Sequence, residues 1–305
     1  MNYINFSHLP VLLNEVIYNL NIQPSGTYID ATVGGGGHAV EIAKKLTIGR
    51  IFAFDKDPDA INFSKERLKK YNVTLINEDF ANMESFVNEK VDGVLMDLGV
   101  SSYQLDNAER GFSYSKTGPL DMRMSKTGES AKHILNSKSA SEIANILKIY
   151  GEEQFAVKIA NEIAVRRVSQ SIETTEDLAN IIKDVVPFKF KRHKNPCKKV
   201  FQAIRIAVND EVLNLKKGLN SAFNLLKPKG RLLVISFHSI EDKIVKNFYR
   251  DKAIGCICSK NFPICICKNV KKANILNKKP ITPSNDEISK NNRAHSAKLR
   301  VLEKL

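Results

Sequence analysis

The sequence predicts an α/β fold in which a parallel sheet carries a helical insertion. Short buried strands alternate with amphipathic helices over the first hundred residues, a helix-rich stretch with no evident strand extends to residue 200, and the alternation then resumes. Strands that alternate with helices favour a parallel sheet with right-handed crossovers. We therefore expect residues 1–107 and 201–305 to form one discontinuous domain, and residues 108–200 to form the insertion.

The elements of the first part follow from hydrophobic periodicity and from turn residues. Apolar side chains at helical spacing predict a helix over residues 10–21, and Pro24, Ser25 and Gly26 end it. Short apolar runs predict strands, with helices between them; the strands are expected at 28–33, 51–54, 73–76 and 91–96, and the helices at 38–46 and 57–71. The chain thus begins with the repeating unit of a parallel sheet.

The insertion is predicted to be helical, and the last part returns to the α/β pattern. Helices are expected at about 140–150, 152–168 and 175–186, and the last begins with a capping-box pattern from Thr174 to Asp177. An apolar stripe from Val212 to Leu226 predicts another helix. The remaining expectations are a buried strand at 231–236, a helix to about Arg250, a loop-rich segment 251–305 and a last strand at 298–301.

Basic charge is concentrated in two segments. The chain has 305 residues and a formal net charge of +14; residues 185–205 contain seven Lys or Arg and no acid, and residues 251–305 contain twelve Lys or Arg and four acids. Clustered basic charge favours contact with polyanions through counterion release, although a solvated face or a tail has the same composition. The predicted phosphate contacts are Lys189, Lys191, Arg192 and Lys194.

The sequence favours a cytoplasmic protein. Its first eight residues lack the basic segment followed by an apolar one that a signal peptide requires. No apolar run approaches the roughly 18 residues that suggest a membrane span. Hydrophobic residues make up 43% of the chain, which is enough to fill a core. We expect no contact with membranes.

A glycine run marks a ligand site between the first strand and the next helix. Gly34 to Gly37 precede His38 and fit G-x-G-x-x-A up to Ala39, and Asp55 follows 21 residues after Gly34 at the end of the next strand. Glycines let a ligand approach the main chain, and a carboxylate in that place accepts hydrogen bonds from a ribose diol. A tight turn without a ligand, and a helix-capping role for Asp55, are the alternatives.

The charge beside this loop favours a cationic ligand over a dinucleotide. Asp30 lies just before the loop, where it would repel a pyrophosphate. S-adenosylmethionine carries a sulfonium and an amino acid instead of phosphates, so it suits this carboxylate better. Asp79 and Phe80 follow the third strand and could bracket an adenine, unless Phe80 only packs its loop.

Motifs over nearly the whole chain, in the same order, resemble the bacterial RsmH/MraW family. The resemblance becomes specific where the fourth strand ends, at Asp97. The segments that carry it are His8–Leu13, Asp97–Gln104, Asp106–Ser113, Gly118–Met124, Tyr150–Glu153, Phe201–Ile206 and Ile235–Ser239. The resemblance implies a Rossmann-like methyltransferase with a helical insertion. It also implies a reaction, in which S-adenosylmethionine methylates N4 of cytosine 1402 in the decoding centre of 16S ribosomal RNA, within the small (30S) subunit. We infer no obligatory protein partner.

Site residues are carried over where the motifs match. The resemblance places the donor on Gly36, Gly37 and His38, with the ribose on Asp55, the adenine beside Phe80, and Asp97 and Gln104 completing the site. The glycine run differs from the family's usual G-x-G-G-H only by a glycine at the variable position. The C-terminal segment departs most, so no role is carried over to it.

The implied reaction is an in-line displacement of the sulfonium methyl by a weakly nucleophilic amine. We expect Asp97, or backbone carbonyls near Leu98, to hold the amine hydrogens and turn the lone pair toward the methyl. A full general base is not required, because the proton can leave after the transfer. The insertion is expected to recognise RNA whose target base is unstacked.

Three other functions use parts of the same pattern. A nicotinamide-dependent dehydrogenase would use the glycine loop and Asp55, but it would leave the basic segments and the Asp97 motif unexplained. A DNA cytosine-N4 methyltransferase usually carries [DS]-P-P-[YFW] where this chain has Asp97-Leu98-Gly99-Val100. A non-catalytic RNA-binding assembly protein would not need a donor site.

The cysteines and His238 remain open. Cys256, Cys258, Cys265 and Cys267 form C-x-C…C-x-C, and Cys197 stands alone. Four thiolates suit tetrahedral zinc, but C-x-C is tighter than the usual ligand spacing, and a cytoplasmic location argues against disulfides. We assign no metal to the mechanism and leave free thiols as the alternative. His238 either faces the ligand site or caps the helix that follows it.

Overall fold

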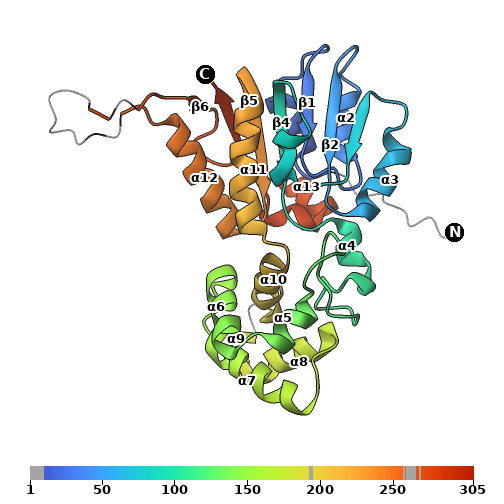
Figure 1. Ribbon diagram of the computed structural model, residues 1–305, viewed down its shortest axis with the longest axis vertical. Coiled ribbons are helices and arrows are strands. Elements are labelled where there is room, and N and C mark those ends of the chain that lie inside the picture. The colour runs from blue at the N-terminus through green and yellow to red at the C-terminus, as the bar shows by residue number, and fades with distance from the viewer. Residues whose placement is uncertain (1–9, 192–194, 257, 259–265, 268) are drawn as a thin grey trace. The chain divides into compact units, whose positions relative to one another are not determined.

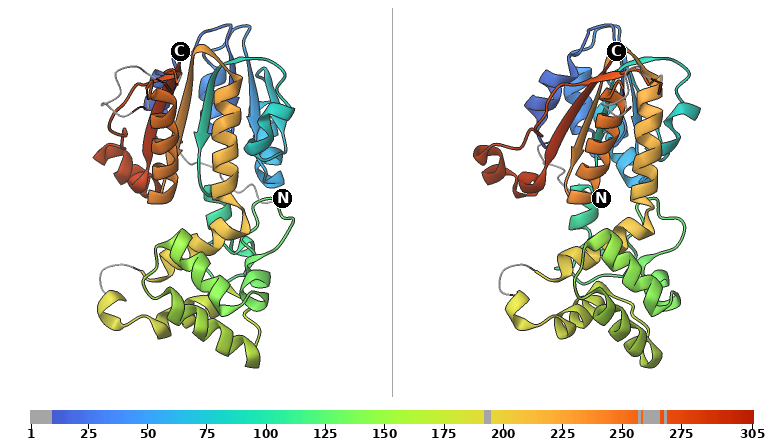
Figure 2. Two further views of the ribbon diagram at one scale, coloured as in Figure 1. Left: turned by 60° about the vertical axis from the view of Figure 1, so that its left-hand side comes forward. Right: turned by 90° about the vertical axis from the view of Figure 1, so that its left-hand side faces the viewer.

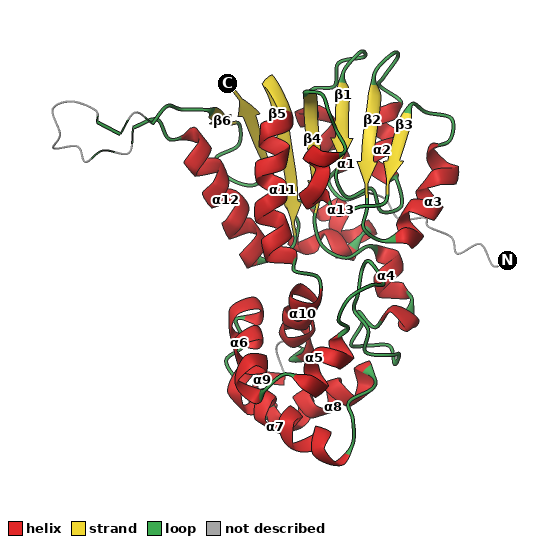
Figure 3. Ribbon diagram, in the orientation of Figure 1, coloured by secondary structure: helices red, strands yellow, loops and turns green. Residues whose placement is uncertain are grey.

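The chain folds into two compact units. The computed structural model describes residues 10–191, 195–256, 258, 266–267 and 269–305. Unit 1 contains Met1–Gly99 and Leu213–Leu305, and unit 2 contains Val100–Val212. Figure 3 shows the sheet of unit 1 with its helices, and the helices of unit 2. An α/β unit that is interrupted by a helical one confirms the predicted fold class.

One twisted sheet forms the centre of unit 1 (Figure 1). Its seven strands have the order β3-β2-β1-β4-β5-β7-β6. Pairing is parallel from β3 to β5, and β7 pairs antiparallel with both β5 and β6. The strands are β1 (Thr27–Asp30), β2 (Arg50–Phe54), β3 (Val73–Ile76), β4 (Val91–Asp97), β5 (Leu226–Ser236), β6 (Ala273–Ile275) and β7 (Lys298–Lys304).

Helices cover both faces of this sheet (Figure 2). Successive side chains of a strand point to opposite faces, so Val94 and Met96 pack with one helical layer and Leu95 packs with the other. The first layer contains α11 and α12, and the second contains α1 and α2. The helices of unit 1 are α1 (Leu13–Leu20), α2 (Gly37–Ala43), α3 (Pro58–Leu68), α11 (Glu211–Leu225, which begins at the boundary), α12 (Ser239–Ala253) and α13 (Asn285–Lys290), with 3₁₀ helices η1 (Phe80–Ser85) and η3 (Asn292–Ser296).

The order of the strands reverses between β1 and β4. In an open α/β sheet, ligands bind outside the carboxyl ends of the strands at such a reversal. Asp30 ends β1, Asp55 follows β2, and Asp97 ends β4. Because these three strands are parallel neighbours, the topology brings three predicted acidic residues to one edge of the sheet.

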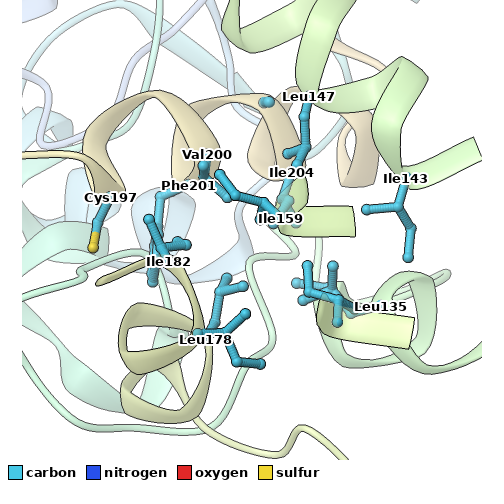
Figure 4. Close-up of a cluster of buried hydrophobic side chains, with 14 of the residues drawn as sticks. Leu135, Ile143, Leu147, Ile159, Leu178, Ile182, Cys197, Val200, Phe201 and Ile204 are labelled. Atoms are coloured by element: carbon cyan, nitrogen blue, oxygen red, sulfur yellow. The ribbon is translucent and has the colours of Figure 1, made fainter. Parts of the chain in front are cut away.

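Unit 2 packs short helices around its own apolar core. Figure 4 shows side chains from several of these helices meeting in that core, including Leu147, Ile159 and Ile204. Capping boxes begin α6 at Ser139 and α8 at Thr174, and the second of these confirms the sequence prediction. The helices are α4 (Ser102–Asp106), α5 (Ala131–Ser137), α6 (Ala140–Gly151), α7 (Ala156–Ser169), α8 (Thr175–Val185), α9 (Phe188–Lys191) and α10 (Cys197–Val208), with the 3₁₀ helix η2 (Ala108–Arg110).

The boundaries of the units differ from those expected from the sequence. The expected insertion was 108–200, but residues 100–107 and 201–212 also belong to unit 2. The physical reason is packing: α10 buries Phe201 and Ile204 in the core of unit 2, and Leu105 packs against the same core. An apolar stripe shows that a helix is buried, but it does not show which core buries it.

Several elements of the structure were not predicted. α5 and α10 belong to unit 2, and β6 and α13 lie in the C-terminal segment that the sequence left loop-rich. The last strand, β7, extends to Lys304 rather than ending at Val301, and it is antiparallel in an otherwise mostly parallel sheet. Within the described ranges, no helix is long and apolar enough to cross a membrane.

Candidate active site

The glycine run forms the turn between β1 and α2. Gly36 is the residue before the helix and has a φ of 72°, in the left-handed region that favours glycine. A Cβ on Gly37 would lie 2.5 Å from Cγ of Pro10, so a side chain at that position would displace the segment before α1. The turn is therefore sterically restricted to glycine at two of its positions, for two different reasons.

Asp55 ties this turn to the start of α3. Its Oδ2 accepts a hydrogen bond from the N–H of Gly34 at 2.9 Å, and its Oδ1 accepts one from the N–H of Asp57 at 2.9 Å. The helix itself is capped by Asp57, whose Oδ1 accepts a hydrogen bond from the N–H of Asp59. A carboxylate oxygen has a further lone pair, so Asp55 retains acceptor capacity toward a ligand diol.

Burial raises the pKa of all three carboxyl groups at this edge. The pKa of Asp55 rises to about 6, that of Asp30 to about 7, and that of Asp97 to about 8. The negative charge of Asp55 adds to the increase at Asp30, and the charges of Asp30 and Glu241 add to the increase at Asp97. Desolvation and like charge both disfavour the ionised form. A positive group placed among these carboxylates would reverse both effects.

Asp97 has an oxygen without a partner. Its backbone N–H donates a hydrogen bond to Thr32 Oγ1 at 2.7 Å, which fixes the end of β4 against the β1 turn. Its Oδ1 is buried and makes no hydrogen bond to the described residues. Buried polar atoms are nearly always hydrogen-bonded, so this orphaned oxygen indicates a group that the free chain does not supply.

His38 is a neutral neighbour of Asp97. Its Nε2–H donates to the carbonyl of Val11 at 3.0 Å, and its Nδ1 lies 3.7 Å from Asp97 Oδ2. Burial lowers the pKa of His38 to about 4, so the ring carries no charge near neutral pH. The imidazole therefore does not neutralise Asp97, and it links α2 to the segment before α1.

Phe80 packs against α11. A Cβ on Gly218 would lie 2.4 Å from Cδ2 of Phe80, so the ring rests directly on the backbone of that helix. Asp79 is already engaged: its side chain caps η1, accepts from Nδ2 of Asn214 at 3.0 Å, and lies 3.3 Å from Nζ of Lys56. The packing alternative for Phe80 is therefore present in the structure, while its predicted contact with an adenine stays a prediction.

His238 caps the helix after β5. Its Nδ1 accepts the N–H of Glu241, and Glu241 Oε2 accepts the N–H of Phe237 at 2.8 Å. Of the two roles left open for His238, the structure shows the cap. Glu241 is buried and its charge acts on Asp97, a connection that sequence reasoning missed although the spacing of a capping box was present.

Gln104 belongs to unit 2. It is buried at the third position of α4, where its Oε1 accepts the N–H of Ser101 at 3.0 Å and its own N–H donates to Ser101 Oγ at 3.2 Å. This capping box gives the side chain a local role in unit 2. Its predicted contact with the methyl donor stays a prediction.

The predicted phosphate contacts are described only in part. Lys189 is exposed and its Nζ lies 5.1 Å from the ring centroid of Phe190. That ring packs edge-on against Phe155 at 5.1 Å between centroids, which attaches α9 to α7. The backbone of Lys191 ends α9, whereas Arg192 and Lys194 lie outside the described residues.

The geometry of unit 1 suits a ligand with a positive centre and a diol. The carboxyl cluster contains Asp30, Asp55 and Asp97, and the residues that sequence reasoning missed are Pro10, Thr32, Gly218 and Glu241. These missed residues position others by packing or by hydrogen bonds. Apart from the capping pattern before Glu241, no sequence signal marked them, because such contacts depend on the tertiary structure.

The chain is similar over nearly its whole length to known proteins. The model of the MraW methylase family matches residues 5–305. Ribosomal RNA small subunit methyltransferase H of Carboxydothermus hydrogenoformans is 48% identical over 307 residues, covering 98% of each chain. The enzyme of the same name from Brevibacillus brevis is 47% identical over 314 residues and covers 100% of both chains. A solved rRNA methylase from Streptococcus thermophilus is 12% identical with a TM-score of 0.43, covering 96% of this chain and 92% of that one. The chain belongs to the MraW methylase family.

Proposed function

We propose that this chain transfers a methyl group from S-adenosylmethionine to N4 of a decoding-centre cytosine in 16S ribosomal RNA of the small ribosomal subunit. Similarity over the whole length to enzymes named for methylating small subunit ribosomal RNA supports the substrate class. The observation that carries the proposal is the buried, unpartnered Oδ1 of Asp97 at the switch point of the sheet. The reaction then takes place in the cytoplasm, where ribosomal RNA is found in bacteria.

The donor fits the site by charge and by shape. S-adenosylmethionine supplies an activated methyl group on a positively charged sulfur. Asp30 and Asp97, whose pKa values are raised by burial, would be ionised most favourably beside a cation. Asp55 would accept the ribose hydroxyls through its remaining lone pairs, and the backbone of Gly36 and Gly37 would let the adenosyl group approach closely. A pyrophosphate would instead meet three carboxyl groups.

The chain contributes alignment rather than a strong base. The exocyclic amine of cytosine must turn its lone pair toward the methyl, and an acceptor for its N–H groups achieves that. Asp97, with one free oxygen at the end of β4, is our candidate for this acceptor, and the backbone carbonyl of Leu98 is the alternative. His38 has a low pKa and its Nδ1 lies 3.7 Å from Asp97 Oδ2, so it leaves the charge of that carboxyl group unneutralised.

Unit 2 is proposed to contact RNA. Residues 185–205 are strongly basic and most of them belong to this unit's α9 and α10. Phosphate contacts of Lys and Arg position RNA without reading its sequence. The exposed Lys189 and Phe188 lie on α9, which places a cation and an aromatic ring on one short helix.

Mapping of radiolabelled methyl groups on small-subunit ribosomal RNA tests the reaction. We expect label at N4 of a single decoding-centre cytosine, and label at any other atom or nucleotide would refute the assignment. Equilibrium binding of S-adenosylmethionine and of NAD to the full chain tests the donor separately. Binding of NAD with equal or higher affinity would contradict the argument from the carboxyl cluster.

Matched charge variants test the role of unit 2. Replacing the four predicted contacts by Gln should weaken RNA binding and flatten its salt dependence, while donor binding stays unchanged; these are Lys189, Lys191, Arg192 and Lys194. The control removes four exposed charges from unit 1, at Lys45, Lys65, Lys69 and Lys70. Equal salt slopes for the two variants would refute the proposed RNA surface.

A further inference from the structure

Three thiols converge in the segment between α12 and β6. The Sγ atoms of Cys256, Cys258 and Cys267 all lie within 4.8 Å of one another. Those of Cys256 and Cys267 are 3.8 Å apart. Cys256 is exposed and the other two are partly buried, so the cluster is accessible to ions from solvent. This segment forms no part of the carboxyl cluster described above.

The two ends of this segment are held side by side by hydrogen bonds. The N–H of Lys272 donates to the carbonyl of Lys252 at 2.9 Å. Further along, Nδ2 of Asn269 donates to the carbonyl of Ile254 at 3.1 Å. These contacts align the chain that leaves α12 with the chain that enters β6 (Figure 1), which brings Cys256 opposite Cys267.

Two apolar side chains in the described part of this segment pack little. The side chains of Ile266 and Val270 are 67% and 64% exposed. Ordering a residue costs conformational entropy of about 1–2 kcal/mol, and exposed side chains offset little of that cost. The groups that do converge here are three thiols, which are metal ligands.

The sulfur geometry matches a tetrahedral metal. Zinc–thiolate bonds of about 2.3 Å at tetrahedral angles place two sulfur atoms about 3.8 Å apart, and Cys256 and Cys267 have this separation. A disulfide would require about 2.05 Å. We propose that Cys256, Cys258 and Cys267 bind Zn²⁺ through their three thiolates.

The chemistry of the site favours zinc and needs no oxidant. As each sulfur–zinc bond forms, the thiol releases its proton to solvent, and the metal keeps its oxidation state. Soft thiolate donors in a tetrahedral arrangement select zinc over the hard cations Mg²⁺ and Ca²⁺. Three thiolates on Zn²⁺ leave a net negative charge, and the segment 251–305, with twelve Lys or Arg and four acids, is basic overall. The tight C-x-C spacing therefore does not prevent ligation, because Cys267 joins Cys256 and Cys258 in one cluster; Cys265 lies outside the described residues.

Metal analysis of the full chain tests the site. After growth with zinc and exhaustive desalting, we expect about one Zn²⁺ per chain, and a mercurial that titrates thiols should release it. Exchange with Co²⁺ should produce the absorption of thiolate-to-cobalt charge transfer. Replacing Cys256, Cys258 and Cys267 together by serine should reduce bound zinc at least about fivefold. The matched control is Cys197→Ala, because that thiol lies in the core of unit 2 and should not bind metal.

Two further measurements keep the test decisive if a variant folds poorly. Donor binding by the triple serine variant should equal that of the parent, which shows that unit 1 is intact. In the parent, removal of zinc by a chelator should open the segment between residues 254 and 272 to protease, without changing donor affinity. Metal-free protein with three reduced thiols, a triple variant that retains its zinc, or a native Cys256–Cys267 disulfide would each overturn the proposal. None of these results depends on methyl transfer.

Discussion

Replacing Asp97 by asparagine should stabilise the donor-free protein and weaken binding of the donor. The wild-type carboxyl group is buried beside Asp30 and Glu241, and its pKa rises from 3.8 to about 8. In the unfolded chain the same group ionises near 3.8, so the folded state binds more protons between these pH values. By linkage, the free energy of unfolding falls as pH rises through that window. Asparagine cannot ionise, so it removes this loss.

The magnitude follows from the shift. One pKa unit corresponds to about 1.4 kcal/mol, so at pH 7 the raised pKa sets a ceiling of about 4 kcal/mol on the stabilisation. The amide of asparagine is also buried without a partner, which costs about 1–3 kcal/mol. We therefore expect a net gain of about 1–3 kcal/mol, or a rise in melting temperature of several degrees. The gain should vanish near pH 4, because the folded group is protonated there and the unfolded group is close to its own pKa, so the electrostatic loss is small.

Thermal unfolding of the two donor-free proteins at pH 4, 7 and 8 measures this gain, and calorimetric titration measures donor binding. The control is Glu84→Gln, which makes the same chemical change at an exposed position of unit 1. A pH-independent difference between the Asp97→Asn variant and the parent would refute the electrostatic explanation. Unchanged donor affinity together with a wild-type methylation rate would refute the role of Asp97 in the site.

The remaining predictions concern packing, buried hydrogen bonds and pH. Gly218→Ala should destabilise unit 1 by about 1–3 kcal/mol, because its Cβ would lie 2.4 Å from the ring of Phe80. The second substitution Phe80→Ala should remove most of that clash, and a double-mutant cycle of melting temperatures measures this coupling. Asn209→Ala should destabilise unit 2 by about 2–4 kcal/mol, because it removes the hydrogen-bond partners of the Met124 N–H and the Met122 carbonyl. Urea unfolding measures the loss of stability, and Asn220→Ala is the control at an exposed position. Donor affinity should rise with pH between about 6 and 8, by at most about tenfold per pH unit for each carboxyl group that must ionise. Calorimetry at constant ionic strength should show proton release on binding at the lower pH. A donor affinity that does not change over this range would contradict a cationic ligand among the carboxylates.

The sheet of unit 1 was predictable because its signals are local. Apolar runs followed by Asp30, Asp55 and Asp97 identify strand ends, and the rule that parallel strands share a carboxyl edge brings these residues together. The antiparallel β7 was placed at nearly the right residues but without its direction. Strand direction depends on the connection that precedes it, and that connection contains β6 and α13, which have weak periodicity.

The supporting contacts of the site were not predictable in the same way. The partner of the Asp97 N–H is Thr32, and the ring of Phe80 rests on Gly218, which lies more than a hundred residues further along the chain. A single sequence gives no register between such distant segments. The unit boundary failed for the same reason, since no sequence signal showed that α10 packs in the core of unit 2.

The carboxyl cluster requires structural support at this edge of the sheet. Three acidic side chains on neighbouring strands repel one another when ionised, and burial makes their ionised forms still less favourable. Such an arrangement persists only if the surrounding structure holds it. The N–H of Gly34 donates to Asp55, and the N–H of Asp97 donates to Thr32. These hydrogen bonds, with an apolar core on each face of the sheet, provide that support. A cationic ligand then binds at a site whose like charges are already fixed in place, so its binding free energy is not spent on assembling them.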